Sequence, residues 1–180
     1  NERQIEILEG LKKEARTRGL WNFWLTDSDL GPGLTTVEYA YIAEETGRAH
    51  IAAEVFNCSA PDTGNMEVLE RYGTETQKKE WLEPLFNGEI RSAYAMSEPS
   101  VASSDATNIS MPASLENGEW VLNGEKTYIS GAGDKRCKIL ICMVKTNPES
   151  ERHKQHAQIL VPMDTPGLEI VRPMEVFSMD

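Results

Sequence analysis

The fold of this chain follows from one stretch, Tyr94-Ala-Met-Ser-Glu-Pro-Ser-Val-Ala-Ser-Ser-Asp-Ala-Thr-Asn108. An apolar-leaning segment, residues 90–96, leads into it, and Glu98-Pro99 then opens a run of small, hydroxyl-bearing residues. Because proline keeps the preceding residue extended, the pattern predicts a strand that opens into a loop. Small side chains let a ligand approach such a loop, where hydroxyl and N–H groups can donate hydrogen bonds. The stretch is therefore either a cofactor-binding loop or a plain surface turn.

The residues that follow have the pattern of short strands separated by turns. Turn signals such as Asn117-Gly118, Asn123-Gly124 and Pro166-Gly167 recur at regular spacing. This spacing predicts an antiparallel β-barrel or sandwich. The expected strands are residues 91–97, 108–115, 120–122, 126–130, 137–145, 157–161 and 168–172.

The residues that precede it have a helical period instead. Apolar side chains at Ile5, Leu8, Leu11 and Ala15 predict an amphipathic helix that Gly19 ends. Further helices are expected after a cap at Thr35 or Thr36, with Glu38 in the first turn and Gly47 near the end, within residues 50–58, and at 65–72 and 76–82. Helices before strands indicate an α+β chain, with an all-α helical domain at residues 1–89 and a β domain at residues 90–180.

Composition excludes several classes of protein. A formal net charge of −11 over 180 residues argues against nucleic-acid binding, and no segment approaches about 18 uninterrupted apolar residues, so no membrane span is expected. Cys58, Cys137 and Cys142 form no C-x-x-C motif and fit free thiols in an intracellular protein. His50 and His156 lack partners at ligand spacing, so no metal is expected. The abrupt ends lead us to expect a piece of a longer protein.

Four ordered blocks of this sequence resemble the acyl-CoA dehydrogenase family. They are residues 72–82, 94–105, 120–133 and 159–167. The 94–105 block departs from the family pattern, with Ser100 and Ala102 where glycines are usual and with an extra residue at Ser103. The runs 101–108 and 152–156 are most similar to members ten and eleven of the family.

The resemblance implies an N-terminal helical domain and a middle β domain, with a further helical domain expected beyond Asp180. In the family that further domain supplies the glutamate base, so no catalytic residue is assigned here. The implied activity is the FAD-dependent oxidation of an acyl-CoA thioester to the trans-2-enoyl-CoA, as in fatty-acid β-oxidation. The alternatives are a flavin oxidase or monooxygenase of the same superfamily, or a non-catalytic flavin- and acyl-CoA-binding fragment.

The resemblance also implies partners and a compartment. An acceptor like electron-transfer flavoprotein would take the electrons, and the intact protein would be a homodimer or homotetramer. The compartment would be the mitochondrion or peroxisome in a eukaryote and the cytoplasm in a bacterium.

The same resemblance implies which residues bind the cofactor. Ser97 and Ser130 stand where the family has threonines that donate to the flavin, and Tyr128 replaces a flanking tryptophan. Either Ser103 or Ser104 would touch the acyl-CoA, and Ser104 is preferred. The implied cofactor-binding residues are Tyr94, Ala95, Met96, Ser97, Glu98, Pro99, Ser103, Ser104, Tyr128, Ile129 and Ser130.

Charged residues near these blocks have two interpretations each. Arg152, His153 and Lys154 form a compact basic patch that either contacts the phosphates of CoA, with His153 and Lys154 as substrate-binding residues, or is a solvated hairpin tip. Glu98 is expected to order the loop rather than act as a base. Asp105 is expected to cap a turn rather than transfer a proton.

Overall fold

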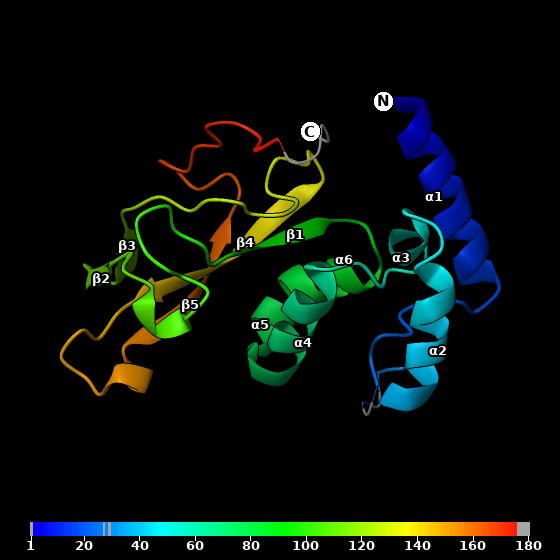
Figure 1. Ribbon diagram of the computed structural model, residues 1–180, viewed down its shortest axis with the longest axis horizontal. Coiled ribbons are helices and arrows are strands. Elements are labelled where there is room, and N and C mark those ends of the chain that lie inside the picture. Colours follow the sequence, from blue (N-terminus) through cyan, green and yellow to red (C-terminus); the bar gives the residue numbers. More distant parts are fainter. Residues whose placement is uncertain (1, 27, 29, 176–180) are drawn as a thin grey trace. The chain divides into compact units, whose positions relative to one another are not determined.

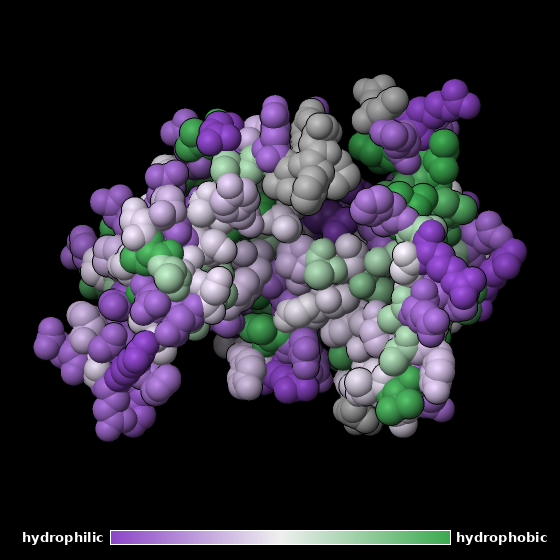
Figure 2. Space-filling view, viewed as in Figure 1, coloured by the Kyte–Doolittle hydropathy of each residue, from purple (hydrophilic) through white to green (hydrophobic). Residues whose placement is uncertain are grey.

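The computed structural model describes residues 2–26, 28 and 30–175 (Figure 1). Contacts within the chain divide it into two units, Asn1–Glu89 and Ile90–Asp180. Helices fill the first unit and strands in sheets the second, which confirms the α+β order expected from the change of period. On the face drawn in Figure 2, small hydrophobic areas are separated by hydrophilic ones.

In the described residues of the first unit, helices are the regular secondary structure, and loops join them. A capping box at Thr35 and Glu38 starts the second helix, as predicted, and Gly47 ends it. The predicted helix within residues 50–58 shortens to one turn. The helices are α1 (Glu2–Thr17), α2 (Thr36–Thr46), α3 (Ala52–Val55), α4 (Asp62–Tyr72), α5 (Glu75–Gln77), the π-helical η1 (Lys78–Leu82) and α6 (Glu83–Phe86).

The buried face of α1 differs from the predicted one. Leu8 and Ala15 are buried, but Ile5 and Leu11 are 45% and 37% exposed. Lys12 takes their place: its side chain is 2% exposed, and Nζ lies 2.8 Å from Glu9 Oε1 and 3.1 Å from Glu54 Oε1. A lysine can occupy this position because its aliphatic stem packs against apolar neighbours and its charge is paired.

A polar cluster closes the end of α6. The carbonyl of Phe86 accepts hydrogen bonds from Trp21 Nε1 at 2.9 Å, Asn22 Nδ2 at 3.1 Å and Asn57 Nδ2 at 3.2 Å. Asn57 Nδ2 also donates to Asn22 Oδ1 at 2.8 Å and to the Leu85 carbonyl at 3.0 Å. The last carbonyls of a helix have no partner within it, so these side chains satisfy them and join three segments of the unit.

The second unit contains a three-stranded sheet and a separate hairpin. The sheet has the order β1 (Arg91–Ala95), β4 (Cys137–Lys145), β5 (His156–Pro162), and the hairpin pairs β2 (Ala113–Glu116) with β3 (Glu119–Leu122). β4–β5 and β2–β3 are antiparallel, as predicted. β1 and β4 are parallel, because the long connection between them returns the chain to the same end of the sheet.

Three expected strands are wrong in part or in full. Residues 126–130 form no strand, since Tyr128 has a left-handed φ of 54° that interrupts an extended ladder. Residues 168–172 form none either, and Val171 is 75% exposed. The strand expected at 108–115 shortens to β2, because Ala106–Asn108 form a 3-10 turn, η2.

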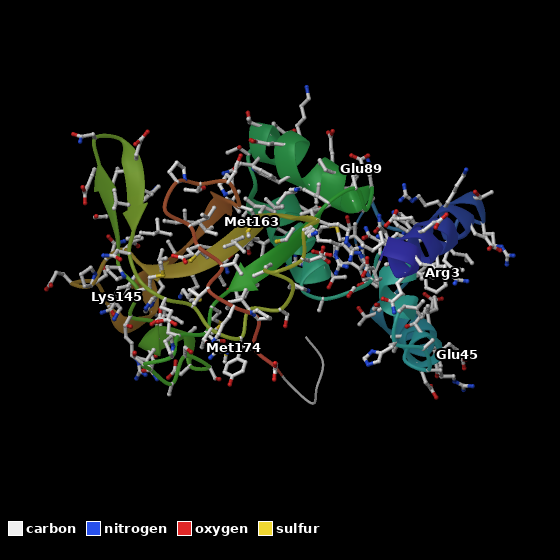
Figure 3. All side chains as sticks on the ribbon, turned by 90° about the horizontal axis from the view of Figure 1, so that it is seen from above. Arg3, Glu45, Glu89, Lys145, Met163 and Met174 are labelled. Carbon is white, nitrogen blue, oxygen red and sulfur yellow. The ribbon has the colours of Figure 1, made fainter. Side chains whose placement is uncertain are left out.

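The central strand β4 is buried on both faces of the three-stranded sheet, since the consecutive residues Ile139, Leu140, Ile141 and Cys142 are all buried. Ala93 and Ala95 of β1 stand opposite Leu140 and Cys142 of β4, and all four are buried. Ile129 packs against both core clusters that these residues form, and Met163 packs against one of them (Figure 3). Ala95, which is buried, can therefore offer a ligand little besides its backbone groups, whereas Ile129 is only partly buried.

Candidate functional site

Two segments named in the sequence analysis lie side by side. The Thr127 N–H donates to the carbonyl of Ser97 at 2.9 Å. A Cβ added at Gly131 would lie 3.5 Å from the carbonyl oxygen of Ser92. Residues 127–131 therefore run beside residues 92–97 in the opposite direction, which brings the loop of Ser97 next to the segment of Tyr128 and Ser130.

The carboxylate of Glu98 is the centre of this site. The whole residue is only 7% exposed. Oε2 accepts from the Ser110 N–H at 2.9 Å and from the Ser110 hydroxyl at 2.6 Å, and Oε1 accepts from the Met111 N–H at 2.9 Å. The expectation that Glu98 orders its loop is confirmed, because these bonds tie it to the chain that enters β2.

Lys126 is the residue that sequence reasoning missed. Its Nζ donates to Glu98 Oε1 at 2.8 Å, to the Met96 carbonyl at 3.0 Å and to the Met143 carbonyl at 2.6 Å. The side chains of the ion pair are 4% exposed for Glu98 and 9% for Lys126. Two signals were present: Lys126 lies in the block 120–133 that resembles the family, and it begins a segment expected to be a strand. A lysine there by itself favours a solvated position.

These contacts stabilise the ionised form of Glu98. Burial raises the pKa of the Glu98 carboxyl, but the Lys126 ammonium and the donors of Ser110 and Met111 outweigh burial and hold the pKa at about 2, below its ordinary 4.5. Burial is also the main cause that raises the pKa of the nearby Cys142 thiol. Glu98 is therefore a carboxylate with its acceptor positions occupied, and it is unsuited to take a proton.

We expect the Glu98 carboxylate to make the protein sensitive to acid. Because the folded pKa lies below 4.5, the stabilisation is complete above about pH 5 and is lost as the pH falls towards 2. A shift of this size corresponds to roughly 3 kcal/mol. Urea unfolding of wild type and Glu98→Gln, measured from pH 7 to pH 2, should show a stability difference that narrows over this window. A difference independent of pH would contradict the assignment.

Ser97, Tyr128 and Ser130 keep groups available to a ligand. In the part of the chain that the structure describes, the hydroxyls of Ser97 and Ser130 form no hydrogen bond to protein. Ser97 is half-buried and Ser130 is exposed. Tyr128 is 63% exposed and combines this with a left-handed backbone, which is uncommon for a bulky residue. Two free hydroxyls and an aromatic ring therefore lie on adjoining segments.

Tyr94 is held within the sheet. Its hydroxyl accepts from Gln158 Nε2 at 3.0 Å and donates to Met143 Sδ at 3.7 Å. Burial is the main cause that raises the pKa of this phenol. The side chain joins all three strands of the sheet, so its hydroxyl is already engaged on the protein side.

The structure distinguishes Ser103 from Ser104, the two candidates for contact with the acyl-CoA. Ser103 is buried, and its hydroxyl accepts from the Glu98 N–H at 2.9 Å, so it closes the loop from inside. Ser104 is exposed. Among the two, Ser104 is the residue whose side chain is open to a substrate.

The basic patch is joined to this loop by Arg152. Nε of Arg152 donates to Thr107 Oγ1 at 2.9 Å, and Nη2 donates to Asp105 Oδ2 at 3.1 Å. Asp105 also accepts from the Thr107 N–H at 2.9 Å, which confirms it as a turn cap, and the Thr107 hydroxyl is the main cause that lowers its pKa. Arg152 therefore brings the tip that carries His153 and Lys154 to the loop.

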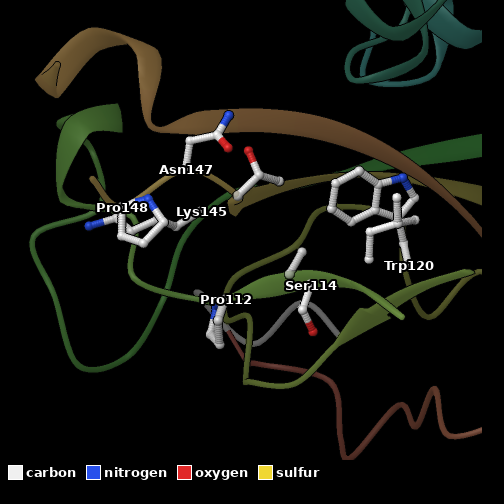
Figure 4. A pocket seen from close by; sticks show the side chains of 9 residues that line it. Pro112, Ser114, Trp120, Lys145, Asn147 and Pro148 are labelled. Atoms are coloured by element: carbon white, nitrogen blue, oxygen red, sulfur yellow. The ribbon is translucent and has the colours of Figure 1, made fainter. Parts of the chain in front are cut away.

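A separate cavity of about 540 Å³ lies beside the hairpin (Figure 4). Figure 4 shows Trp120 at one end and Lys145 with Pro148 at the other. The cavity is lined by residues 112–115, 120 and 145–148, and none of the predicted site residues is among them. It is a feature apart from the candidate site.

Two further findings concern the described residues alone. Within residues 2–26, 28 and 30–175, no helix is long and apolar enough to cross a bilayer. Over the same residues, no group of three or more His, Cys, Asp or Glu side chains could hold a metal ion.

Comparison with known families gives two matches that together cover nearly all of the chain. Residues 1–89 match the family described as acyl-CoA dehydrogenase, N-terminal domain, and residues 93–180 match acyl-CoA dehydrogenase, middle domain. Among curated relatives, acyl-CoA dehydrogenase family member 11 of Mus musculus is 54% identical over 96% of this chain and 22% of its own length. Probable acyl-CoA dehydrogenase FadE2 of Mycobacterium tuberculosis is 54% identical over 96% of this chain and 42% of its own length.

Solved structures agree with these matches. A protein of Mycobacterium abscessus that is assigned as an acyl-CoA dehydrogenase has a TM-score of 0.92 and 51% identity, over 95% of this chain and 42% of that one. A glutaryl-CoA dehydrogenase of Mycobacterium smegmatis, solved in complex with FADH2, has a TM-score of 0.65 and 26% identity, over 88% of this chain and 38% of that one. The chain thus spans less than half the length of these relatives.

Proposed function

Because this chain belongs to the acyl-CoA dehydrogenase family, as its N-terminal and middle domains, we propose that the intact protein oxidises an acyl-CoA thioester to the trans-2-enoyl-CoA with FAD. Electrons would then pass to a separate electron-carrying flavoprotein. The observation that carries the proposal is the hydrogen bond from the Thr127 N–H to the Ser97 carbonyl at 2.9 Å, which joins the two segments that carry the free hydroxyls.

The residues present fit a flavin in chemical terms. The edge of an isoalloxazine ring needs neutral donors and acceptors, and its face needs a flat surface. Ser97 and Ser130 supply neutral hydroxyls, and the exposed ring of Tyr128 supplies an aromatic surface with a polar tip. Gly131, with a φ of 82°, lets the chain turn directly after Ser130.

The chain's own residues would bind and orient the reactants. FAD, when bound, supplies the acceptor for the hydride that leaves Cβ of the acyl group. Ser97 and Ser130 would donate hydrogen bonds to its ring system, and Glu98 would stay ionised and hold the loop. No proton transfer is assigned to the described residues, because the carboxylate nearest this site is already occupied by donors.

Substrate binding is proposed at Ser104, His153 and Lys154. Arg152 joins the hairpin tip to the loop through Asp105, so these three side chains lie on segments that are held together. Cationic groups complement phosphate oxygens, and CoA carries several phosphates. Lys154 Nζ also pairs with Glu151 Oε2 at 2.9 Å, an exposed contact that a phosphate could replace at small cost.

The test is an absorption spectrum of the intact protein that carries this chain. A yellow protein whose colour is bleached by one acyl-CoA, and less by others, would support both cofactor and substrate class. In Ser97→Ala and in Ser130→Ala we expect the Kd for FAD to rise about three- to tenfold, since one hydrogen bond is lost in each.

Ser114→Ala is the matched control for these variants. Its hydroxyl is exposed on the hairpin and donates to Glu116 Oε1 at 2.7 Å. We expect this change to leave FAD binding unaltered. An intact protein that binds no FAD, or a flavin that no acyl-CoA reduces, would contradict the proposed function.

A further inference from the structure

The ion pair of Glu98 and Lys126 stands next to the hydrogen bond that joins the two site segments. Glu98 directly follows Ser97, and Lys126 directly precedes Thr127. The backbone bond from Thr127 to Ser97 and the side-chain bond from Lys126 Nζ to Glu98 Oε1, at 2.9 Å and 2.8 Å, therefore lie one residue apart on both segments. One backbone hydrogen bond and one ion pair therefore join the two segments at adjacent positions.

The backbone groups around Ser97 form hydrogen bonds with Lys126 or with residues next to the ion pair. Lys126 Nζ fixes the carbonyl of Met96, Thr127 fixes the carbonyl of Ser97, and Ser103 Oγ fixes the N–H of Glu98. The two consecutive peptide groups that flank Ser97, on its N–H side and on its carbonyl side, are thereby held, the second of them at both its C=O and its N–H. The hydroxyl of Ser97 is left without a protein partner in the described part of the chain, and its position is determined by its held backbone.

The same pair reaches two other parts of the unit. Lys126 Nζ donates to the Met143 carbonyl in β4 at 2.6 Å, and Glu98 accepts from Ser110 and Met111 before β2. All the donor positions of the ammonium are used. Burial keeps water away from the charges, so each contact is stronger and stiffer than it would be at the surface.

We propose that Glu98 and Lys126 are positioning residues, which set the Ser97 hydroxyl against the segment of Tyr128 and Ser130 and so define the geometry of flavin binding. The proposal rests on the proposed function. It differs from a purely structural role because it predicts that flavin binding and fold stability can be separated.

A double variant separates the effect on flavin binding from the effect on fold stability. Lys126→Met and Glu98→Gln alone each leave a buried group without its charged partner, and each should lower stability. Glu98→Gln with Lys126→Met removes both charges and should recover part of that stability. It does not recover the geometry, because methionine cannot donate to the carbonyls of Met96 and Met143.

Lys12→Met is the matched control. Lys12 is also a buried lysine paired with carboxylates, at 2% side-chain exposure, but it belongs to the helical unit. Its loss should lower stability without a change in flavin geometry. Lys126→Met and Lys12→Met thus remove the same kind of buried, paired lysine from two different units of the chain.

The experiment measures three quantities on the intact protein and these four variants. They are the Kd for FAD, the visible circular dichroism of the flavin at saturating FAD, and the midpoint of urea unfolding. We expect the Kd to rise about tenfold or more in both single variants and in the double variant, with an altered dichroism. In Lys12→Met we expect the Kd to stay within about twofold of wild type, with an unaltered dichroism.

The outcomes are distinguishable. If the double variant regains wild-type affinity and dichroism along with its stability, or if Lys12→Met alters them equally, the pair is structural and the inference is overturned while the proposed function stands. If the wild-type protein binds no FAD, both are overturned.

Discussion

Lys126→Met is expected to lower the free energy of unfolding by about 3 to 5 kcal/mol, because it leaves the buried carboxylate of Glu98 without its partner. The Nζ–Oε1 distance is 2.8 Å, and the glutamate side chain is 4% exposed, so water cannot replace the ammonium. The carbonyls of Met96 and Met143 lose a donor in the same change. Urea unfolding of the intact protein at pH 7 measures the loss.

The pH dependence of this variant provides its control. Without Lys126, burial is opposed only by the donors of Ser110 and Met111, so the pKa of Glu98 should rise from about 2, and the folded variant would bind a proton more readily than folded wild type. The deficit of Lys126→Met relative to wild type should then shrink as the pH falls from 7 towards 2. A deficit that stays constant over this range would mean that lost packing, and not an unpaired charge, causes the destabilisation.

Asn57→Ala is the second change with a large expected effect, a loss of about 2 to 4 kcal/mol. The amide of Asn57 donates to Asn22 Oδ1 and to the carbonyls of Leu85 and Phe86, and all three bonds disappear. The backbone at this position has a φ of 55°, which asparagine tolerates and alanine does not. Thermal and urea unfolding of the intact protein measure the sum of both effects.

Asn57→Gly separates the two contributions. Glycine loses the same three hydrogen bonds but accepts the left-handed backbone. We expect Asn57→Gly to be more stable than Asn57→Ala by about 1 kcal/mol, with both below wild type. If alanine proves as stable as glycine, backbone strain makes no contribution at this position.

The helical half shows what a local pattern can and cannot predict. Thr35 and Glu38 form the expected capping box because both partners lie within one turn, where sequence spacing is also spatial spacing. The apolar period of α1 gave the helix but not its buried face. Lys12 is buried there because Glu54, on another helix, neutralises it.

In the candidate site, too, some features could be predicted from the sequence and others could not. The resemblance predicts that the motif around Ser97 and the segment of Tyr128 and Ser130 bind the flavin, and the structure brings these two segments together. Lys126 was not identified, because a lysine in a short polar segment looks solvated. Nothing in the sequence near Arg152 indicated its bond to Asp105, which lies 47 positions away.

The sequence by itself determined the local features of this protein: the change from helix to strand near Glu89, the cap at Thr35 and the bounds of β4 at Cys137–Lys145. These depend on periodicity and turn chemistry among neighbours. Only the tertiary structure decided that β1 and β4 are parallel and that Glu98 meets Lys126 at a separation of 28 positions. A buried charge is stable only beside a partner, and the fold alone determines which partner it meets.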